Sequence, residues 1–124
     1  MHTAEGAVTW WEIDVPDVRQ AQQFYEAVCP VWTFQPMEGF EGYVIVNLGG
    51  TGVGALQAST DTEPSGRGTR LYVEVSNLEN TLARVREGGG RVEQERMPIP
   101  GDQWIGTARD PFGNRIGFVT SNPA

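Results

Sequence analysis

The six residues IDVPDV, Ile13–Val18, return in a related form as VEVSNL, Val73–Leu78, 60 residues further along the chain. In each copy an alternating apolar stretch comes first, as in a strand, and a residue suited to starting a helix follows. Asp17 and Asn77 hold the corresponding position, where a side-chain oxygen accepts hydrogen bonds from the first backbone amides of a helix. The stretch therefore predicts a strand followed by a helix, twice in one chain.

The residues around each copy extend the repeat to β-α-β-β-β. The first half predicts strands and a helix over 8–15, 18–28, 31–35, 43–48 and 53–58. The second half predicts them over 69–75, 78–87, 91–97, 103–109 and 114–121, with GGG at 88–90 ending the helix. We therefore expect an α+β fold of two paired modules, at about 8–58 and 69–121, joined by a polar hinge over 59–68. Each helix covers one sheet face, so the two open faces predict a cleft or half-barrel within a single domain, 1–124.

Composition narrows the possible partners. The chain has 124 residues and a formal net charge of −7, and all nine basic residues are arginine. An acidic protein repels nucleic acid, so we expect no nucleic-acid partner. No apolar run approaches the length of a membrane span, and the first residues lack the pattern of a signal peptide. A single cysteine, Cys29, excludes an intrachain disulfide, and these features together favour a cytoplasmic location.

Several motifs carry a family resemblance over roughly residues 8–121. They are Val15-x-Asp17 with Ala21-x-x-Phe24-Tyr25 in the first half, and Val75-x-Asn77-Leu78, Ala83-Arg84-Val85 before GGG and Asp110-Pro111-x-Gly113-Asn114 in the second. In this order they resemble the vicinal-oxygen-chelate superfamily, which includes glyoxalase I, extradiol dioxygenases, and fosfomycin and bleomycin resistance proteins. The resemblance implies paired βαβββ modules of the glyoxalase and bleomycin resistance type, and frequent homodimers.

The residues at the superfamily's metal positions do not suit a metal. The resemblance places ligands near the start of each module's first strand and on its last strand, and here these positions hold Trp10, Gly54, Arg70 and Gly117. A divalent ion needs imidazole, carboxylate or thiolate ligands. His2, the only histidine, lies at the chain terminus. We therefore expect a metal-free member of the superfamily with no cofactor.

Strand alternation predicts what lines the cleft instead of a metal. In the first strand Trp11, Ile13 and Val15 suit the helix side, which leaves Trp10 and Glu12 on the open face. The same alternation, with less definite strand edges for some members, gives a candidate ligand-binding set of Trp10, Glu12, Trp32, Phe40, Tyr43, Asn47, Arg70, Tyr72, Glu74, Met97 and Trp104. The aromatic members would stack on a flat ligand, and the polar members would orient it. The alternative is a purely structural role, in which the tryptophans belong to the hydrophobic core and Glu12, Arg70 and Glu74 form an ion-pair cluster.

Two functions of different classes compete. The first is a metal-independent binding protein that sequesters a bulky, partly aromatic or polyketide-like small molecule, as antibiotic resistance proteins of the superfamily do. The acidic balance favours a cationic ligand. The second is a metal-independent isomerase, cyclase or lyase of secondary metabolism, with Glu12 or Glu74 as general base and Arg70 stabilising an enolate-like charge. A domain without a small-molecule ligand is the third possibility.

Overall fold

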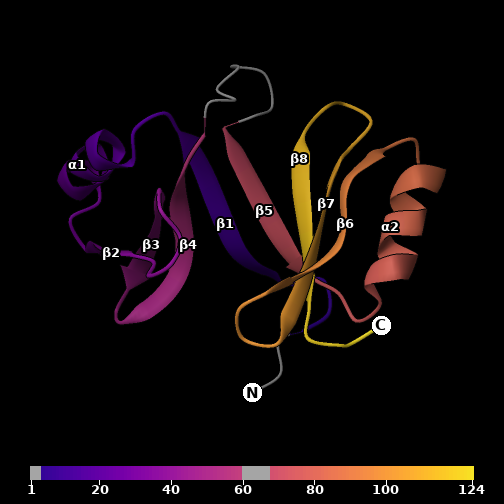
Figure 1. The fold of residues 1–124 in the computed structure, drawn as a ribbon. Helices are drawn as coiled ribbons and strands as arrows, with labels where there is room; N and C mark the ends of the chain where they lie inside the picture. Colours follow the sequence, from indigo (N-terminus) through magenta and orange to yellow (C-terminus); the bar gives the residue numbers. More distant parts are fainter. Residues whose placement is uncertain (1–3, 60–67) are drawn as a thin grey trace. The chain divides into compact units, whose positions relative to one another are not determined.

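The computed structural model describes residues 4–59 and 68–124, and these form eight strands and two helices (Figure 1). The first half contains β1 (Val8–Val15), α1 (Val18–Val28), β2 (Trp32–Pro36), β3 (Tyr43–Leu48) and β4 (Thr51–Ala58). The second half contains β5 (Thr69–Glu74), α2 (Leu78–Glu87), β6 (Arg91–Ile99), β7 (Gln103–Arg109) and β8 (Arg115–Thr120). The α+β class and the order β-α-β-β-β in both halves are confirmed. His2 and most of the predicted hinge lie outside the described residues.

The chain divides into two compact units close to the predicted module boundary. The first-half unit is Trp10–Thr69, and the second-half unit combines Met1–Thr9 with Arg70–Ala124. The cleft that the resemblance implies between the modules stays a prediction. Of the residues that the structure describes, none form a helix long and apolar enough to cross a lipid bilayer.

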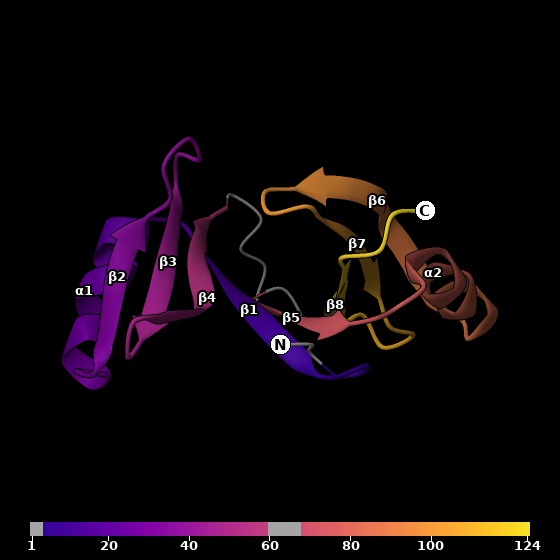
Figure 2. The same ribbon diagram turned by 90° about the horizontal axis from the view of Figure 1, so that it is seen from below.

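In the first-half unit, strand order is β2-β3-β4-β1, with β1 parallel to β4 and the other pairs antiparallel. Its core contains Val44, Val46 and Leu56. Helix α1 packs against this core and lies along one face of the strands (Figure 2). The N-cap prediction is confirmed, because Asp17 Oδ1 accepts from the amides of Arg19, at 2.9 Å, and Gln20, at 3.3 Å.

The apolar stripe of α1 is shorter than its spacing predicts. Val18, Ala21 and Tyr25 pack against the core cluster as expected. Val28, one turn further along, is 54% exposed. The helix ends at this residue, since Cys29 is the C-cap and Pro30 follows. The predicted helix is therefore correct, but its last apolar residue is not part of the core.

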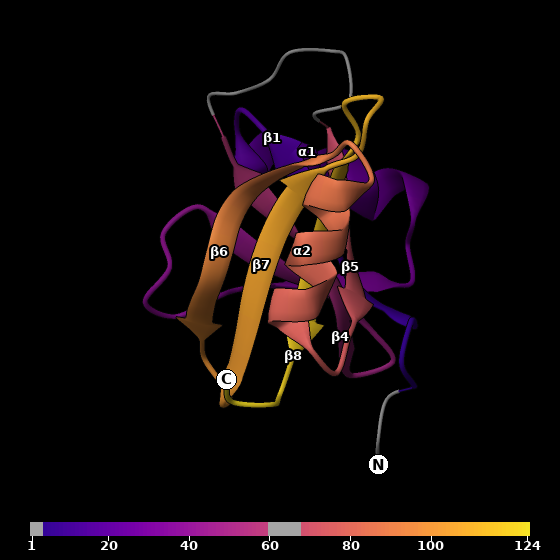
Figure 3. The ribbon, with the colours of Figure 1, turned by 90° about the vertical axis from the view of Figure 1, so that its right-hand side faces the viewer.

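The second-half unit repeats this arrangement with order β5-β8-β7-β6 and β5 parallel to β8. Leu78 and Leu82 of α2 are buried with Val75, Ala108 and Phe118. Figure 3 shows α2 beside β7 on one face of the sheet, and the helix packs against β6, β7 and β8. The sheet face turned away from α2 therefore carries the alternate residues of β5 and β8.

The turn between β7 and β8 is built by one carboxylate. Asp110 accepts hydrogen bonds from the amides of Phe112 and Asn114 at 2.8 and 2.9 Å, and from the side-chain amide of Asn114 at 2.9 Å. The hydrogen bonds from Asn114 lower the pKa of Asp110, and those from Phe112 and Gly113 add to the effect. Because Asp110 and Asn114 make these contacts, residues 110–114, the Asp110-Pro111-x-Gly113-Asn114 motif, form a turn.

Candidate functional site

The open sheet face of the first-half unit carries the polar and aromatic residues that alternate with its core. Val44 and Val46 of β3 are buried in the α1 core cluster, so Tyr43, Ile45 and Asn47 point to the opposite face. This places two predicted site residues, Tyr43 and Asn47, where the sequence put them. Asn47 is paired with Gly52 across the β-bulge that begins after Val46, where β3 and β4 shift register.

Three side chains on this open face form one hydrogen-bond chain, here called the Trp10–Tyr43–Glu12 chain. The Trp10 indole Nε1 donates to the Tyr43 hydroxyl at 3.0 Å, and that hydroxyl donates to Glu12 Oε2 at 2.7 Å. Glu12 is only 8% exposed. The second bond is charge-assisted, which makes it the stronger of the two. The chain therefore holds an indole, a phenol and a carboxylate in fixed positions on one sheet face.

A glycine makes room for the indole of Trp10. A Cβ built on Gly52 would lie 3.4 Å from two atoms, Cζ3 of the Trp10 ring and Cγ2 of Ile45. The ring therefore lies across the sheet over the start of β4 and beside Ile45. A methyl group at this position would meet the indole at about ordinary van der Waals contact, and a side chain larger than that of alanine would have to displace the ring.

On β5, in the second-half unit, the side chains of Arg70, Tyr72 and Glu74 point away from α2. A Cβ on Gly117 would lie 2.4 Å from Cδ1 and Cε1 of Tyr72, so the phenol ring packs directly over this glycine. Tyr72 is 5% exposed, and Arg70 Nη1 donates to its hydroxyl at 3.5 Å. Val73 and Val75, which alternate with these three residues, belong to or pack against the α2 cluster, so the three side chains lie on the other side of the strand. Their contact with a ligand stays a prediction.

Glu74 has an electrostatic environment that favours its protonated form. Burial raises the pKa of its carboxyl group, and the nearby carboxylate of Glu5 raises it further. Glu5 is brought close by the segment before β1: Gly6 N donates to Glu74 O and Glu74 N donates to Ala7 O, both at 2.8 Å. Glu74 could be identified from the sequence and Glu5 could not, because this backbone pairing joins residues far apart in the chain.

Two of the predicted aromatic residues lie on helix-facing sides. The Trp32 ring centroid is 5.4 Å from that of Trp11 and 5.8 Å from that of Tyr25, within the α1 cluster. Trp104 packs against the α2 cluster, with Arg96 Cζ 5.3 Å from its ring centroid. The expectation that these two tryptophans share an open face with the other candidates is therefore wrong. The bounds of these two strands were predicted to within one residue, but alternation alone did not show which face of each strand the helix covers.

Met97 and Phe40, two further residues of the predicted ligand-binding set, are exposed to solvent. Met97 of β6 is 39% exposed and is paired with Ile105 of β7. Phe40 lies between β2 and β3, is 48% exposed, and borders a groove beside α1. Phe40 therefore belongs to a separate feature of the first-half unit, for which the sequence provided no signal.

The strand register corrects one of the four expected metal positions. In the second-half unit Tyr72 pairs with Gly117. Glu12, 60 residues earlier, is the residue equivalent to Tyr72 in the repeat, and its partner in β4 is Ala55. Ala55 is therefore the equivalent of Gly117. Gly54 instead lies under the Trp11 ring on the α1 side, where an added Cβ would be 2.2 Å from Cδ2 of the ring.

None of these positions has a side chain that fits a divalent ion. With the correction they hold Trp10, Ala55, Arg70 and Gly117, and neither an indole, a methyl group, a guanidinium nor a hydrogen atom is a ligand for such ions. Within 4–59 and 68–124, no group of three histidine, cysteine, aspartate or glutamate side chains is placed to hold one. The donor set thus disagrees with the metal chemistry that the superfamily resemblance implies.

Comparison with known proteins supports the assignment of the fold. The family model of the glyoxalase-like domain matches residues 10–119. No significant match to a curated protein was found. Among solved structures, a glyoxalase/bleomycin resistance protein/dioxygenase superfamily member from Vibrio splendidus 12B01 is similar with a TM-score of 0.66 and 20% identity, covering 89% of this chain and 95% of that one.

Two further structures are similar at lower identity. The Mn(II)-bound glyoxalase from Novosphingobium aromaticivorans gives a TM-score of 0.67 at 15% identity, covering 94% of this chain and 39% of that one. Methylmalonyl-CoA epimerase from Streptomyces coelicolor gives 0.58 at 18% identity, covering 97% and 100%. At such identities the likeness concerns the fold alone.

Proposed function

The chain belongs to the glyoxalase-like domain family, and from this premise we propose that it is a metal-independent binding protein that sequesters a bulky, partly aromatic, cationic small molecule. The Trp10–Tyr43–Glu12 chain is the observation that supports the proposal. It combines an aromatic surface for stacking with a carboxylate for a positive charge, and hydrogen bonds hold both in place before any ligand arrives.

Binding without chemistry fits this arrangement of groups. The superfamily's metal positions carry no ligating side chains here, as shown above. The Tyr43 hydroxyl accepts from Trp10 and donates to Glu12, so its proton is already committed. A site whose groups are held in this way can orient a ligand without exchanging protons with it. The superfamily resemblance, which implies frequent homodimers, extends the proposal to a homodimer, and the single cysteine is the reason for proposing a cytoplasmic location.

Fluorescence can test the Trp10 site directly. We expect a panel of cationic aromatic drugs to contain a ligand that quenches tryptophan emission saturably and is recovered unchanged by mass spectrometry. Trp10→Phe should remove most of the quenching, and Glu12→Gln should weaken binding. Trp104→Phe is the matched control, because Trp104 packs against the α2 core and its loss should leave the quenching intact. Chemical alteration of the ligand, or equal effects of the two tryptophan changes, would refute the proposal.

A second function is favoured by one specific observation, the raised pKa of Glu74. A carboxylate whose affinity for a proton is increased is better suited to act as a general base. In an isomerase, cyclase or lyase, Glu74 would take a proton from a carbon next to a carbonyl, and Arg70 would stabilise the negative charge on the resulting enolate oxygen. The fold shared with a methylmalonyl-CoA epimerase is compatible with such a step but does not indicate a substrate. Of the two glutamates predicted as bases, Glu74 is therefore the better candidate.

Isotope exchange separates the two functions. If Glu74 is a base, a carbonyl substrate should exchange its α-hydrogen for deuterium in D₂O in the presence of the protein, and Glu74→Gln should abolish the exchange while sparing binding. Glu79→Gln is the control, since Glu79 is bound by Arg96 on the exposed side of α2. Exchange that survives in Glu74→Gln would eliminate Glu74 as the base.

A further inference from the structure

A groove in the first-half unit is assigned to no function by the resemblance or by the site described above. It lies between α1 and the segment 37–42 that connects β2 to β3, and its volume is about 750 Å³. Small-molecule sites commonly have volumes of this order. Its lining includes Val18, Arg19, Glu26, Met37, Phe40 and Glu41.

The wall opposite α1 is held by the backbone of the protein itself. Met37 N donates to Tyr43 O at 2.9 Å, and Phe40 N donates to Met37 O at 3.1 Å, so the segment forms a closed turn. Gly42 has a φ of 76°, and a Cβ on it would lie 2.9 Å from the Cβ of Ala58. Glycine thus allows the segment to approach β4 closely, and the groove exists without a ligand.

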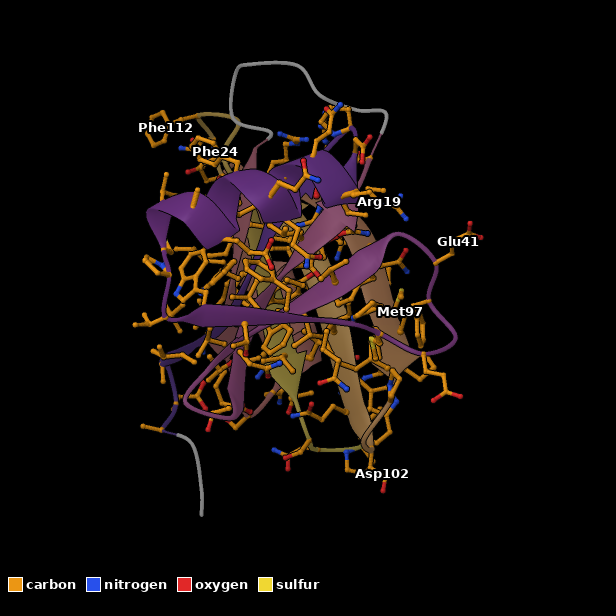
Figure 4. The ribbon with its side chains drawn as sticks, turned by 90° about the vertical axis from the view of Figure 1, so that its left-hand side faces the viewer. Arg19, Phe24, Glu41, Met97, Asp102 and Phe112 are labelled. Atoms are coloured by element: carbon orange, nitrogen blue, oxygen red, sulfur yellow. The ribbon has the colours of Figure 1, made fainter. Side chains whose placement is uncertain are left out.

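The groove combines an apolar lining with charged side chains that are available to a ligand. Val18 and Met37 contribute apolar surface, and Phe40 has half of its surface accessible for stacking. Figure 4 shows Arg19 and Glu41 on the same side of the unit, both extending outward. Across 4–59 and 68–124, no ion pair engages either side chain or that of Glu26, which only accepts a long hydrogen bond from Gln22, at 3.4 Å.

The charges favour one class of ligand. Two carboxylates and one guanidinium line the groove, and the whole chain has a net charge of −7. Arginine has a long flexible stem and can turn its charge to water, whereas the carboxylates line the same groove as Phe40, whose ring itself attracts cations. The balance therefore favours a positive ligand with an apolar or aromatic body.

We propose that the groove between α1 and segment 37–42 is a second ligand site, which binds an aromatic organic cation between Phe40 and the carboxylates of Glu26 and Glu41. The proposal goes beyond the proposed function, because these three residues are outside the Trp10–Tyr43–Glu12 chain. Tyr43 belongs to that chain and also lines the groove. Phe40, predicted from the sequence to contact a ligand, would do so here and not beside Trp10.

The test uses proflavine, a planar aromatic cation, and acridine-9-carboxylate, an anion of similar shape. Titration of the ¹⁵N-labelled protein with proflavine should shift amide resonances of residues 18–26 and 37–44 saturably. The anion should produce much smaller shifts at these residues. Glu26→Gln and Glu41→Gln should each weaken proflavine binding about two- to fivefold, as expected for an exposed ion pair, and Phe40→Ala should weaken it as well.

Two controls separate this site from the Trp10 site. Glu38→Gln removes a neighbouring carboxylate that does not line the groove and should leave proflavine affinity unchanged. Trp10→Phe should also leave the shifts at 18–26 and 37–41 unchanged, even if the proposed function fails. Tyr43 is left out of this comparison because it accepts a hydrogen bond from Trp10. The second site is refuted if proflavine does not bind saturably or if its shifts lie at other residues. It is also refuted if acridine-9-carboxylate binds as tightly as proflavine, or if Glu38→Gln weakens proflavine binding as much as Glu26→Gln and Glu41→Gln do.

Discussion

At the scale of single residues, the site depends on side chains that constrain one another. Tyr43 links an indole donor to a carboxylate acceptor, and Gly52 leaves space for that indole. Alternation predicted the faces of Trp10, Glu12 and Tyr43, but it contained no information on their hydrogen bonds. Those bonds required the register of β1, β4 and β3, which brings residues 31 and 33 positions apart within reach.

Removal of the Tyr43 hydroxyl should show how much the Trp10–Tyr43–Glu12 hydrogen bonds contribute to stability. We expect Tyr43→Phe to lower the free energy of unfolding by about 1–3 kcal/mol, because it removes a neutral and a charge-assisted hydrogen bond beside the buried Glu12. Urea denaturation measures the change. Tyr25→Phe is the matched control, since the Tyr25 hydroxyl has no hydrogen-bond partner within the described residues, and should change stability much less. Equal losses of stability in the two variants would show that the hydrogen bonds of Tyr43 make no specific contribution.

Two glycines of β4 should differ in their tolerance of substitution by alanine. Gly54→Ala would drive a methyl group into the Trp11 ring and should cost about 1–3 kcal/mol of stability through overpacking. Gly52→Ala meets its neighbours at 3.4 Å, near ordinary contact, and should be close to neutral. Thermal or urea unfolding of the pair provides the comparison. A neutral Gly54→Ala would contradict the packing of Trp11 on this glycine.

At the scale of secondary-structure elements, each helix depends on its cap and on a short apolar stripe. Both N-caps, Asp17 and Asn77, were predicted from residue type and position and are confirmed by the hydrogen bonds they accept. The structure adds an anchor for α2 that the sequence did not indicate. Arg96 of β6 binds Glu79 of α2 through two hydrogen bonds of 2.7 and 2.9 Å, and these hydrogen bonds lower the pKa of Glu79.

The cap of α1 can be tested by a paired substitution. Asp17→Ala removes the acceptor of the Arg19 and Gln20 amides and should destabilise the protein by about 1 kcal/mol. Asp17→Asn retains a side-chain oxygen and should lose only a small part of this. Circular dichroism during urea unfolding measures both. If the two substitutions were equally harmful, the charge of Asp17 and not its acceptor role would be the stabilising feature.

At the scale of the whole molecule, acidic groups shape the dependence of stability on pH. The folded pKa of Glu74 is raised above its ordinary value of 4.5, so the folded protein retains this proton where the unfolded chain has released it. The contribution of Glu74 to stability is therefore most favourable below about pH 4.5 and declines as pH rises through the folded pKa. Asp110 acts in the opposite direction: its lowered pKa adds stability above its ordinary value of 3.8, which is lost as pH falls through the folded pKa.

The effect of Glu74 predicts a pH-dependent gain on substitution. Glu74→Gln should become more stable relative to the native protein between pH 4 and 7, by less than about 1 kcal/mol because solvent screens a partly exposed group. Glu5→Gln should produce part of the same gain, since the Glu5 carboxylate is the second cause of the shift. Urea denaturation across this pH range measures both. A stability difference that is constant with pH would contradict the origin of the raised pKa.

The sequence by itself determined the repeated β-α-β-β-β order, both helix caps and the faces of the well-defined strands. These features follow from local propensity and alternation, which act over a few residues. Only the tertiary structure decided that Trp32 and Trp104 pack on the helix sides, that Ala55 and not Gly54 matches Gly117, and that a groove lies beside α1. These depend on strand register and on the approach of segments distant in the chain, where a shift of one residue reverses every side chain.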